Sequence, residues 1–399
     1  MSGLKGGNRV VKLVAAIILL AVMVYGVYRY RNPAEPSPEM AILPWGPTVV
    51  GYIFFAILSG GIADSALLHA YIERNPAARA LIKKSLYGAL AVLIPGIILV
   101  FSDILHPEHS LWFYAGFNPL SRIAWNAVLY LLYGGSLVLL IIALIRGNGD
   151  LERPIVKLLA LATVATSINL EMNLGMAYGI NIAVPAWYGV YSGIVFVIAA
   201  FALGSAWELL IGHKGPEEGV EGAEGLARSY AWENLFSTIS LALIVFWSLL
   251  ALYSWGLASP LAKHIVAGGM ASYFWIGYVL LAFIIPVAGA TLYLWRRTDR
   301  LMLRASMALL IVGIAVLLLV PFNFGGQYLR LEENVMYRLV GSGIEEELSL
   351  GPLLNNYLYG PELLAFIGAF GVWLILDILG EALLPLGPGE KPRRLYIFK

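Results

Sequence analysis

Ten long stretches of apolar residues constrain the fold of this chain more than any other feature. A helix needs about 20 apolar residues to cross the roughly 30 Å hydrocarbon core of a membrane, and each stretch has or approaches that length. We therefore predict an all-α, polytopic integral membrane protein with about ten transmembrane helices. They are expected near residues 10–28, 46–73, 83–102, 122–146, 155–178, 186–211, 232–256, 265–295, 301–321 and 358–385.

The composition and the placement of the charges agree with this interpretation. Apolar residues make up 60% of the chain and charged residues 13%, about half the charged share of a soluble protein. Of the 26 Lys and Arg residues, 20 fall in the termini and loops of one side of the ten-helix arrangement. Basic loops stay in the cytoplasm, so both termini are expected on the cytoplasmic side of the cytoplasmic membrane.

A short pattern near the start of the second stretch recurs later in the chain. Trp45, Gly51 and Phe54 have counterparts 142 positions on, in Trp187, Gly193 and Phe196. The recurrence suggests two four-helix bundles related by a parallel repeat, although chance can produce so short a match. The predicted units are an N-terminal helix with an outer linker (1–43), the first bundle (44–182), the second bundle (183–322), and an acidic outer loop with a C-terminal helix (323–399).

The chain has no cysteine and five histidines. The lack of thiols excludes disulfides, thiolate-held iron–sulfur clusters and cysteine nucleophiles. No two histidines are evidently placed on facing helices at one depth, as a bis-histidine haem requires. We therefore expect no metal and no haem in this chain. We also expect no nucleic-acid partner.

Ionisable side chains inside the membrane are costly and are functional candidates. The stretch 46–73 carries Asp64 and His69, and the stretch 155–178 carries Thr163, Ser167 and Glu171. Together with Thr166, the last three project within an arc of about 140° around a helix. The five residues that we predict to form a proton route from the cytoplasm are Asp64, His69, Thr163, Ser167 and Glu171. Packing of helices through small polar residues is the alternative for the hydroxyl groups, and it explains Glu171 poorly.

The outer corner between the third and fourth stretches combines acidic, basic and aromatic residues. A quinol needs apolar walls for its ring and tail, and groups that accept protons from its two oxygens. Trp and Tyr at this depth can instead form only an interfacial belt. The corner residues predicted to bind quinone are Asp103, His106, His109, Trp112, Tyr114 and Asn118.

Several short motifs carry a family resemblance. They are Pro44-Trp45-Gly46, Ser59-Gly60-Gly61-Ile62-Ala63, Asp103…His106-Pro107-Glu108, Phe117-Asn118-Pro119-Leu120-Ser121 with Trp125, Asn323-Phe324-Gly325-Gly326-Gln327 and Tyr359-Gly360-Pro361-Glu362. With them the chain resembles the NrfD-like membrane subunits of the polysulfide reductase family, closest to the ten-helix branch found with hydrogenase and sulfur-compound redox complexes. His106 stands where the family usually has Arg, which puts the role of that arginine in doubt here.

The resemblance implies a subunit that binds a menaquinone-like quinone near the outer face, within membrane lipid. It also implies electron exchange with a four-cluster, ferredoxin-like iron–sulfur subunit. That partner would join a molybdopterin, nickel–iron or multihaem catalytic subunit that acts in anaerobic respiration or sulfur metabolism. The absence of cysteine agrees, because clusters would have to lie in the partner.

We predict that Asp103 and His106 exchange protons with quinol, with Glu171 beside them in the quinone site. In this hypothesis the chain is the quinone-binding subunit of an oxidoreductase complex and adds no catalytic metal of its own. A secondary transporter with a midplane site made by Asp64 and Glu171 is one alternative. A purely structural membrane anchor for a peripheral enzyme is the other.

Overall fold

The computed structural model describes most of the chain. The described residues are 2–32, 45–104, 106–181, 184, 187, 189, 191–212, 222–254, 259–296, 298–327 and 350–387, without the side chains of 2–9, 111–113, 212, 259–260 and 350–352. The linker expected before residue 44 and the acidic residues of the expected outer loop, Glu332, Glu333 and Glu345 to Glu347, lie outside these ranges.

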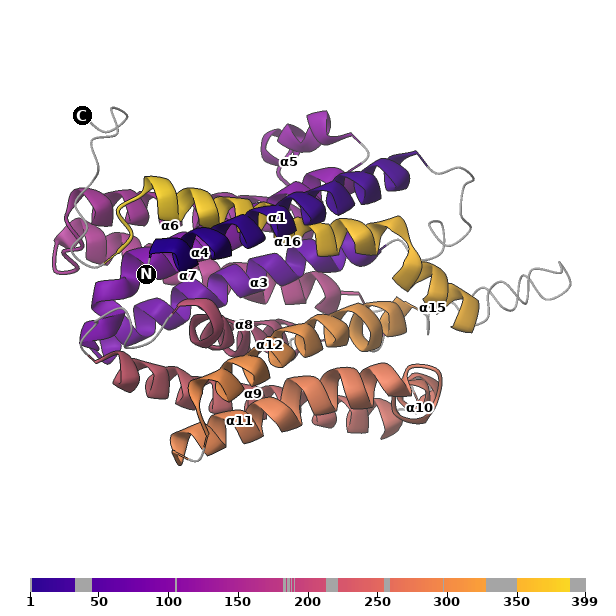
Figure 1. Cartoon of the computed structure of the whole chain (residues 1–399). Coiled ribbons are helices and arrows are strands. Elements are labelled where there is room, and N and C mark those ends of the chain that lie inside the picture. The colour runs from indigo at the N-terminus through magenta and orange to yellow at the C-terminus, as the bar shows by residue number, and fades with distance from the viewer. Residues whose placement is uncertain are drawn as a thin grey trace, which may run out of the picture.

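In the described part, ten helices are long and apolar enough to cross a membrane, and no residue there is in a strand. The prediction of an all-α polytopic membrane protein is thereby confirmed. The ten spans are formed by α1 Ser2–Arg31, α3 Pro47–Leu67 with η1 Leu68–Ile72, α4 Pro76–Asp103, α6 Arg122–Arg146, α7 Pro154–Gly179, α8 Tyr191–Trp207 with η3 Glu208–Gly212, α9 Ala223–Ser254, η5 Tyr273–Ile284 with α11 Ile285–Leu294, α12 Arg300–Leu317 with η6 Leu318–Phe324, and α15 Leu350–Tyr359 with α16 Pro361–Leu383 (Figure 1).

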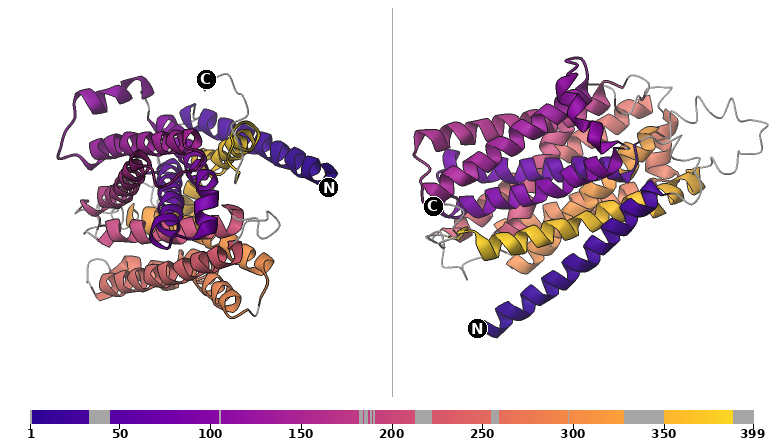
Figure 2. Two further views of the ribbon diagram at one scale, coloured as in Figure 1. Left: turned by 90° about the vertical axis from the view of Figure 1, so that its left-hand side faces the viewer. Right: turned by 90° about the horizontal axis from the view of Figure 1, so that it is seen from above.

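The long helices lie side by side along roughly one direction, from left to right in Figure 1. Lys12 near the start of α1 forms an ion pair of 2.9 Å with Asp377 near the end of α16. We call this end of the bundle the termini end. At the opposite end, the far end, Arg31 donates hydrogen bonds to the Phe101 and Ser102 carbonyls at the end of α4. The N-terminal end of α1 leans away from the rest of the bundle, as Figure 2 shows.

Two helices begin earlier than the hydropathy alone predicted. α4 begins at Pro76, seven residues before the expected start, because the Asn75 side chain accepts a hydrogen bond from the Ala77 N–H and caps the helix. α9 begins at Ala223, nine residues before the expected start. Leu226 and Ala227 among these nine residues are buried, so packing of this face extends the helix.

Two other boundaries were also predicted wrongly. The single helix expected over 265–295 is broken, because the short α10 Ser259–Ala267 ends before Gly268 and the membrane span begins at Tyr273. The helix expected to end at residue 321 continues to Gln327. Its path past Pro321 is π-helical, a form in which extra residues are accommodated without ending the helix. Asn323, expected at the start of a loop, is therefore a fully buried helical residue.

Helix α3 lies at the centre of the bundle, and nearly all of its residues are buried. It packs against α4, α7, α8 and α16. The approach of α3 to α8 is close, since a Cβ atom on Gly61 would overlap the Ala200 carbonyl and one on Gly204 would overlap the Gly61 backbone. Small residues permit such close helix contacts inside a membrane.

The two tryptophans of the suggested repeat are in direct contact. The rings of Trp45 and Trp187 stack with centroids 5.2 Å apart and an interplanar angle of 12°. Helices α3 and α8, which follow these residues, both pass into a π-helical turn at the termini end, η1 and η3. A parallel repeat would produce these contacts, and the division into two four-helix bundles stays a prediction.

Candidate functional site

Two buried acidic residues lie where α3 packs against α7. Ser167 Oγ of α7 donates a hydrogen bond of 2.5 Å to Asp64 Oδ1 of α3. Asp64 is 3% exposed, and its other oxygen, Oδ2, is buried without a hydrogen-bond partner in the described part of the chain. Of the five residues predicted to form a proton route, Asp64 and Ser167 are thus in direct contact.

Glu171 lies one helical turn further along α7. It is fully buried, and neither of its carboxyl oxygens has a hydrogen-bond partner among the described residues. Its side chain fits against Gly60, one turn before Asp64 on α3, where a Cβ atom would overlap Glu171 Oε1. Because α3 and α7 run in opposite directions, the contacts of Asp64 with Ser167 and of Gly60 with Glu171 place both carboxyl groups in one region. We call Asp64 and Glu171 the mid-membrane pair.

The mid-membrane pair is costly to maintain. Burying a carboxylate without a compensating cation is strongly unfavourable, and a buried polar atom without a partner costs about 1–3 kcal/mol. No ion pair to either residue occurs in the described part of the chain. Intramembrane acids of this kind mark proton or ion pathways more often than packing positions.

Thr163, the remaining hydroxyl of the predicted route on α7, is directed differently. It is buried, and its Oγ1 donates a 2.8 Å hydrogen bond to the Leu159 carbonyl one turn back on its own helix. Ser and Thr commonly satisfy their hydroxyl groups in this way inside helices. The described contacts therefore join Ser167, and not Thr163, to Asp64.

A second polar group lies nearer the termini end, and we call it the histidine cluster (Ser65, His69, Glu73 and Glu233). His69 Nε2 is 2.7 Å from Glu233 Oε2, and Ser65 Oγ donates a 2.5 Å hydrogen bond to Glu233 Oε1. His69 Nδ1 lies 2.9 Å from Glu73 Oε2, an ion-pair distance at an angle outside that of a hydrogen bond.

The histidine cluster extends from the protein surface into the buried part of the bundle. The Glu73 side chain is 42% exposed, whereas that of His69 is 2% exposed. Ser65 is the next residue after Asp64 on α3, and its hydroxyl contacts Glu233. The described hydrogen bonds thus join Ser65 and His69 to Glu233 in one group and Ser167 to Asp64 in another.

Glu233 was missed by the sequence reasoning. With α9 expected to begin at residue 232, this glutamate belonged to the interface, whereas the actual start at Ala223 places it ten residues inside the helix. The signal was present, because Leu226, Ala227 and Tyr230 continue a buried helical face before it.

The third polar group lies at the far end, and we call it the far-end cluster (Tyr30, Thr48, Asp103 and Glu362). Thr48 Oγ1 is 2.8 Å from Asp103 Oδ1 and 2.7 Å from Glu362 Oε2. The Tyr30 hydroxyl adds a longer hydrogen bond of 3.4 Å to Asp103. Four helices, α1, α3, α4 and α16, supply one residue each.

The two contacts of the Thr48 hydroxyl bear on the protonation of the Asp103 and Glu362 carboxyl groups. A threonine hydroxyl has one hydrogen to donate, and an ionised carboxylate only accepts. If both contacts are hydrogen bonds, one of the two carboxyl groups must therefore donate to Thr48 and carry a proton. The far-end cluster is thus suited to hold one proton and to accept another.

The position of Glu362 has a structural cause. The first turn of α3 has free N–H groups, and Glu362 Oε2 accepts a 3.2 Å hydrogen bond from the Thr48 N–H. Gly46, the residue that precedes the helix, has no side chain to collide with this carboxyl group. The positive end of the α3 dipole also favours an acid there.

The structure separates Asp103 from Glu171, which were predicted to share one site. Asp103 contacts Thr48 and Glu171 contacts Gly60, and these two positions are twelve residues apart on α3. At 1.5 Å per residue this is about 18 Å of helix. A single quinone ring does not reach both carboxyl groups.

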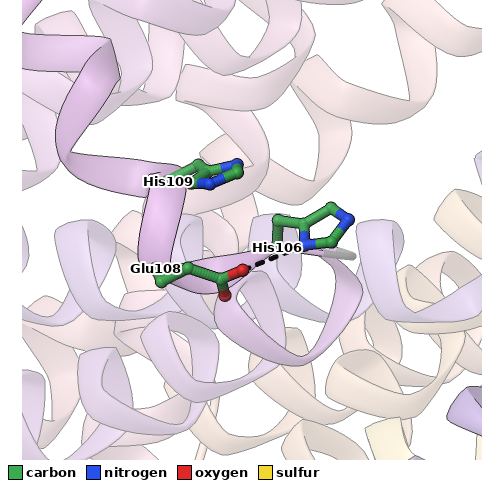
Figure 3. Close-up of side chains that lie close together, drawn as sticks. All are labelled: His106, Glu108 and His109. Atoms are coloured by element: carbon green, nitrogen blue, oxygen red, sulfur yellow. Dashed lines mark hydrogen bonds and ion pairs between the residues drawn. The ribbon is translucent and has the colours of Figure 1, made fainter.

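The remaining corner residues lie at the surface of the far end. His106 and Glu108 are joined by a 2.9 Å contact with exposed side chains, and the His106 and His109 rings stack at 5.2 Å (Figure 3). Hydrogen bonds from its own backbone N–H and from the His106 ring lower the pKa of the Glu108 carboxyl group. Neither histidine has a described contact to Asp103.

Two further corner residues have structural contacts. The half-exposed Tyr114 donates a 3.1 Å hydrogen bond to the Ala127 carbonyl, and Asn118 Oδ1 accepts one of 3.0 Å from the Leu120 N–H in the turn before α6. The side chain of Trp112 lies outside the described part.

Comparison with known proteins gives two findings. The sequence model of a family described as polysulphide reductase, NrfD, matches residues 36–324. The chain is also 22% identical to a selenate reductase subunit of Mesobacillus selenatarsenatis over 424 aligned positions, which cover 94% of each of the two chains.

Proposed function

Because the chain belongs to the polysulphide reductase NrfD family, we propose that it is the quinone-linked membrane subunit of a respiratory oxidoreductase complex. The far-end cluster carries this proposal. It offers two carboxyl groups bridged by one hydroxyl at the end of the bundle, where a lipid-soluble quinol can approach from the membrane. Oxidation of a quinol releases two protons and two electrons, and carboxyl groups of this kind can accept the protons.

In this proposal Asp103 and Glu362 hold and exchange the protons of a menaquinone-like quinol, and Thr48 orients both carboxyl groups. The corner with His106, His109, Trp112, Tyr114 and Asn118 forms the rim of the site. Proton exchange, which was expected of Asp103 and His106 together, is centred here on Asp103 and Glu362. Glu171 belongs to a separate proton route.

We further propose that the electrons pass to a partner subunit. The chain has no cysteine to hold iron–sulfur clusters, so a ferredoxin-like partner at the far end would receive them. That partner would serve a molybdopterin, nickel–iron or multihaem catalytic subunit. The relative named as a selenate reductase subunit supports a reductase complex, with electron flow away from quinol.

The proton route of this proposal starts at the termini end. The bias of basic residues favours a cytoplasmic location for that end and for both termini. The route would run from Glu73 through His69, Glu233 and Ser65 to Asp64. Ser167 and Glu171 would continue it into the middle of the membrane, and Thr163 would line it without entering the chain of contacts.

One observation favours a second candidate function. The mid-membrane pair has buried oxygens without partners among the described residues, as expected for the substrate or ion site of a secondary transporter. A transporter would need no quinone and no redox partner. A structural anchor, the third possibility, would need the partner and no quinone.

Isolation of the protein from its native membrane distinguishes the three. The tagged chain is purified in mild detergent, its bound quinone is extracted and quantified, and the co-purifying subunits are identified by mass spectrometry. The proposal predicts both bound quinone and iron–sulfur partners. Partners without quinone would indicate the anchor, and a chain that purifies alone without quinone would indicate the transporter.

A further inference from the structure

The exposed turn after α4 gathers three side chains of the kind that bind metals. The possible ligand atoms of His106, Glu108 and His109 all lie within 4.8 Å of one another, and Figure 3 shows the three side chains on one side of the turn. Exposed side chains are free to adjust around an ion. We call this group the corner triad.

The local backbone explains why the two histidines meet. The 3₁₀ helix η2 spans Pro107–Leu111, and the His109 N–H donates a 2.9 Å hydrogen bond to the His106 carbonyl. In a 3₁₀ turn, residues three apart are eclipsed on the same face. The imidazole rings accordingly stack at 5.2 Å with an interplanar angle of 26°. Pro107 between them fixes its own φ and favours the turn.

The chemistry of the donors selects a class of metal. Two imidazoles and a carboxylate suit first-row transition metals such as Zn²⁺ and Cu²⁺. Zinc bonds of about 2.0–2.1 Å to nitrogen place the ligand atoms of a tetrahedral site about 3.4 Å apart. Modest rotations of the three exposed side chains close the remaining gap, and water or a partner's side chain would complete the coordination.

We infer that His106, Glu108 and His109 form a binding site for a divalent transition-metal cation at the surface of the far end. No metal was expected from the sequence, because only histidines on facing helices were considered, whereas this site is formed within a single turn. A bound ion would cross-link that turn, which begins three residues after Asp103. The site itself does not depend on the proposed quinone function.

Metal binding to the full chain tests the inference directly. Zn²⁺ alone is titrated into the purified protein, without quinone, and Cu²⁺ is added to a second sample for electron paramagnetic resonance. We expect one ion per chain and hyperfine splitting from two imidazole nitrogens. The variants H106N and H109N should each weaken binding by at least about tenfold, a loss that even outer-shell partners produce. E108Q, which removes the charge and keeps the size, should weaken it as well.

The histidine of α10 provides the matched control. H264N makes the same change at a histidine that lies outside the corner triad, and it should leave the affinity unaltered. Equal affinity in the wild type and the H106N/H109N double variant would overturn the inference, as would a copper spectrum without nitrogen splitting. Since no quinone is present, failure of the quinone proposal leaves this result unaffected.

Discussion

Ser167 and Asp64 are joined by a 2.5 Å hydrogen bond that fixes the register of α7 against α3. One turn nearer the far end on both helices, the same register sets Glu171 against Gly60. A single helix crossing thereby brings together two acids that are 107 residues apart in the sequence. Nearer the termini end, His69 contacts Glu233 of α9.

Asp64 is expected to be needed for proton uptake from the termini end. D64N keeps the size of the side chain and removes its ionisable proton, so the route should be interrupted at a buried acid. Proton uptake by the complex in proteoliposomes should fall by at least about tenfold, since general acid–base groups typically contribute about 10²–10⁴-fold. D377N is the matched control, because Asp377 is in an ion pair near the surface. Uptake by D64N at the wild-type rate would contradict the route.

Glu233 should have the same effect on proton uptake as Asp64, although it comes from the other half of the chain. E233Q removes the charge that His69 and Ser65 contact, and the same assay should show reduced uptake. E224Q alters another glutamate of α9, one that pairs with Arg300 at the termini end. We expect near-normal uptake for E224Q; equal losses in both variants would indicate general damage to α9.

Gly61 is expected to be required for the packing of α3 on α8. In G61A the new methyl group meets the Ala200 carbonyl, which belongs to a rigid backbone. Such overpacking costs about 1–3 kcal/mol and should lower the midpoint of thermal unfolding in detergent. Gly135 of α6 has open space around it, so G135A should be neutral or stabilising by about 0.5–1 kcal/mol. A G61A protein as stable as the wild type would refute this close approach.

Glu362 should contribute to quinol oxidation by taking up a proton that quinol releases. E362Q keeps the hydrogen bonds of the carboxyl group to Thr48 and removes its capacity to take up a proton. We expect quinol-driven turnover to decrease by about tenfold or more and its pH profile to change. T48V, in which the bridging hydroxyl is replaced by a methyl group, should lower turnover with a smaller change in the profile. An E362Q enzyme with the wild-type rate and profile would exclude Glu362 from the site.

Much of this fold follows from the sequence because a membrane span is a local property. Ten apolar stretches predict ten helices, and short motifs such as Pro44-Trp45-Gly46 predict the family, both of which are confirmed. Helix starts were predicted less well where a cap decides them, as Asn75 does for α4. Because the predicted start of α9 was wrong, Glu233 was assigned to the interface and was not predicted as a site residue.

The partners within the site were less predictable, because they depend on contacts between distant segments. Thr48, Asp103 and Glu362 come from three helices, and no spacing along the chain brings them together. The same holds for Ser65 and Glu233. By contrast, the contact of His106 with His109 follows from one turn of backbone.

The central claim is that this chain passes electrons from quinol at the far-end cluster to a partner. The most direct test is the turnover of the isolated complex with a soluble menaquinol analogue, compared with its turnover on a reduced viologen that donates to the partner. For D103N we predict a decrease of about 10²–10⁴-fold with the quinol and unchanged activity with the viologen. Quinol-driven turnover of D103N equal to that of the wild type, with viologen activity intact, would contradict the claim.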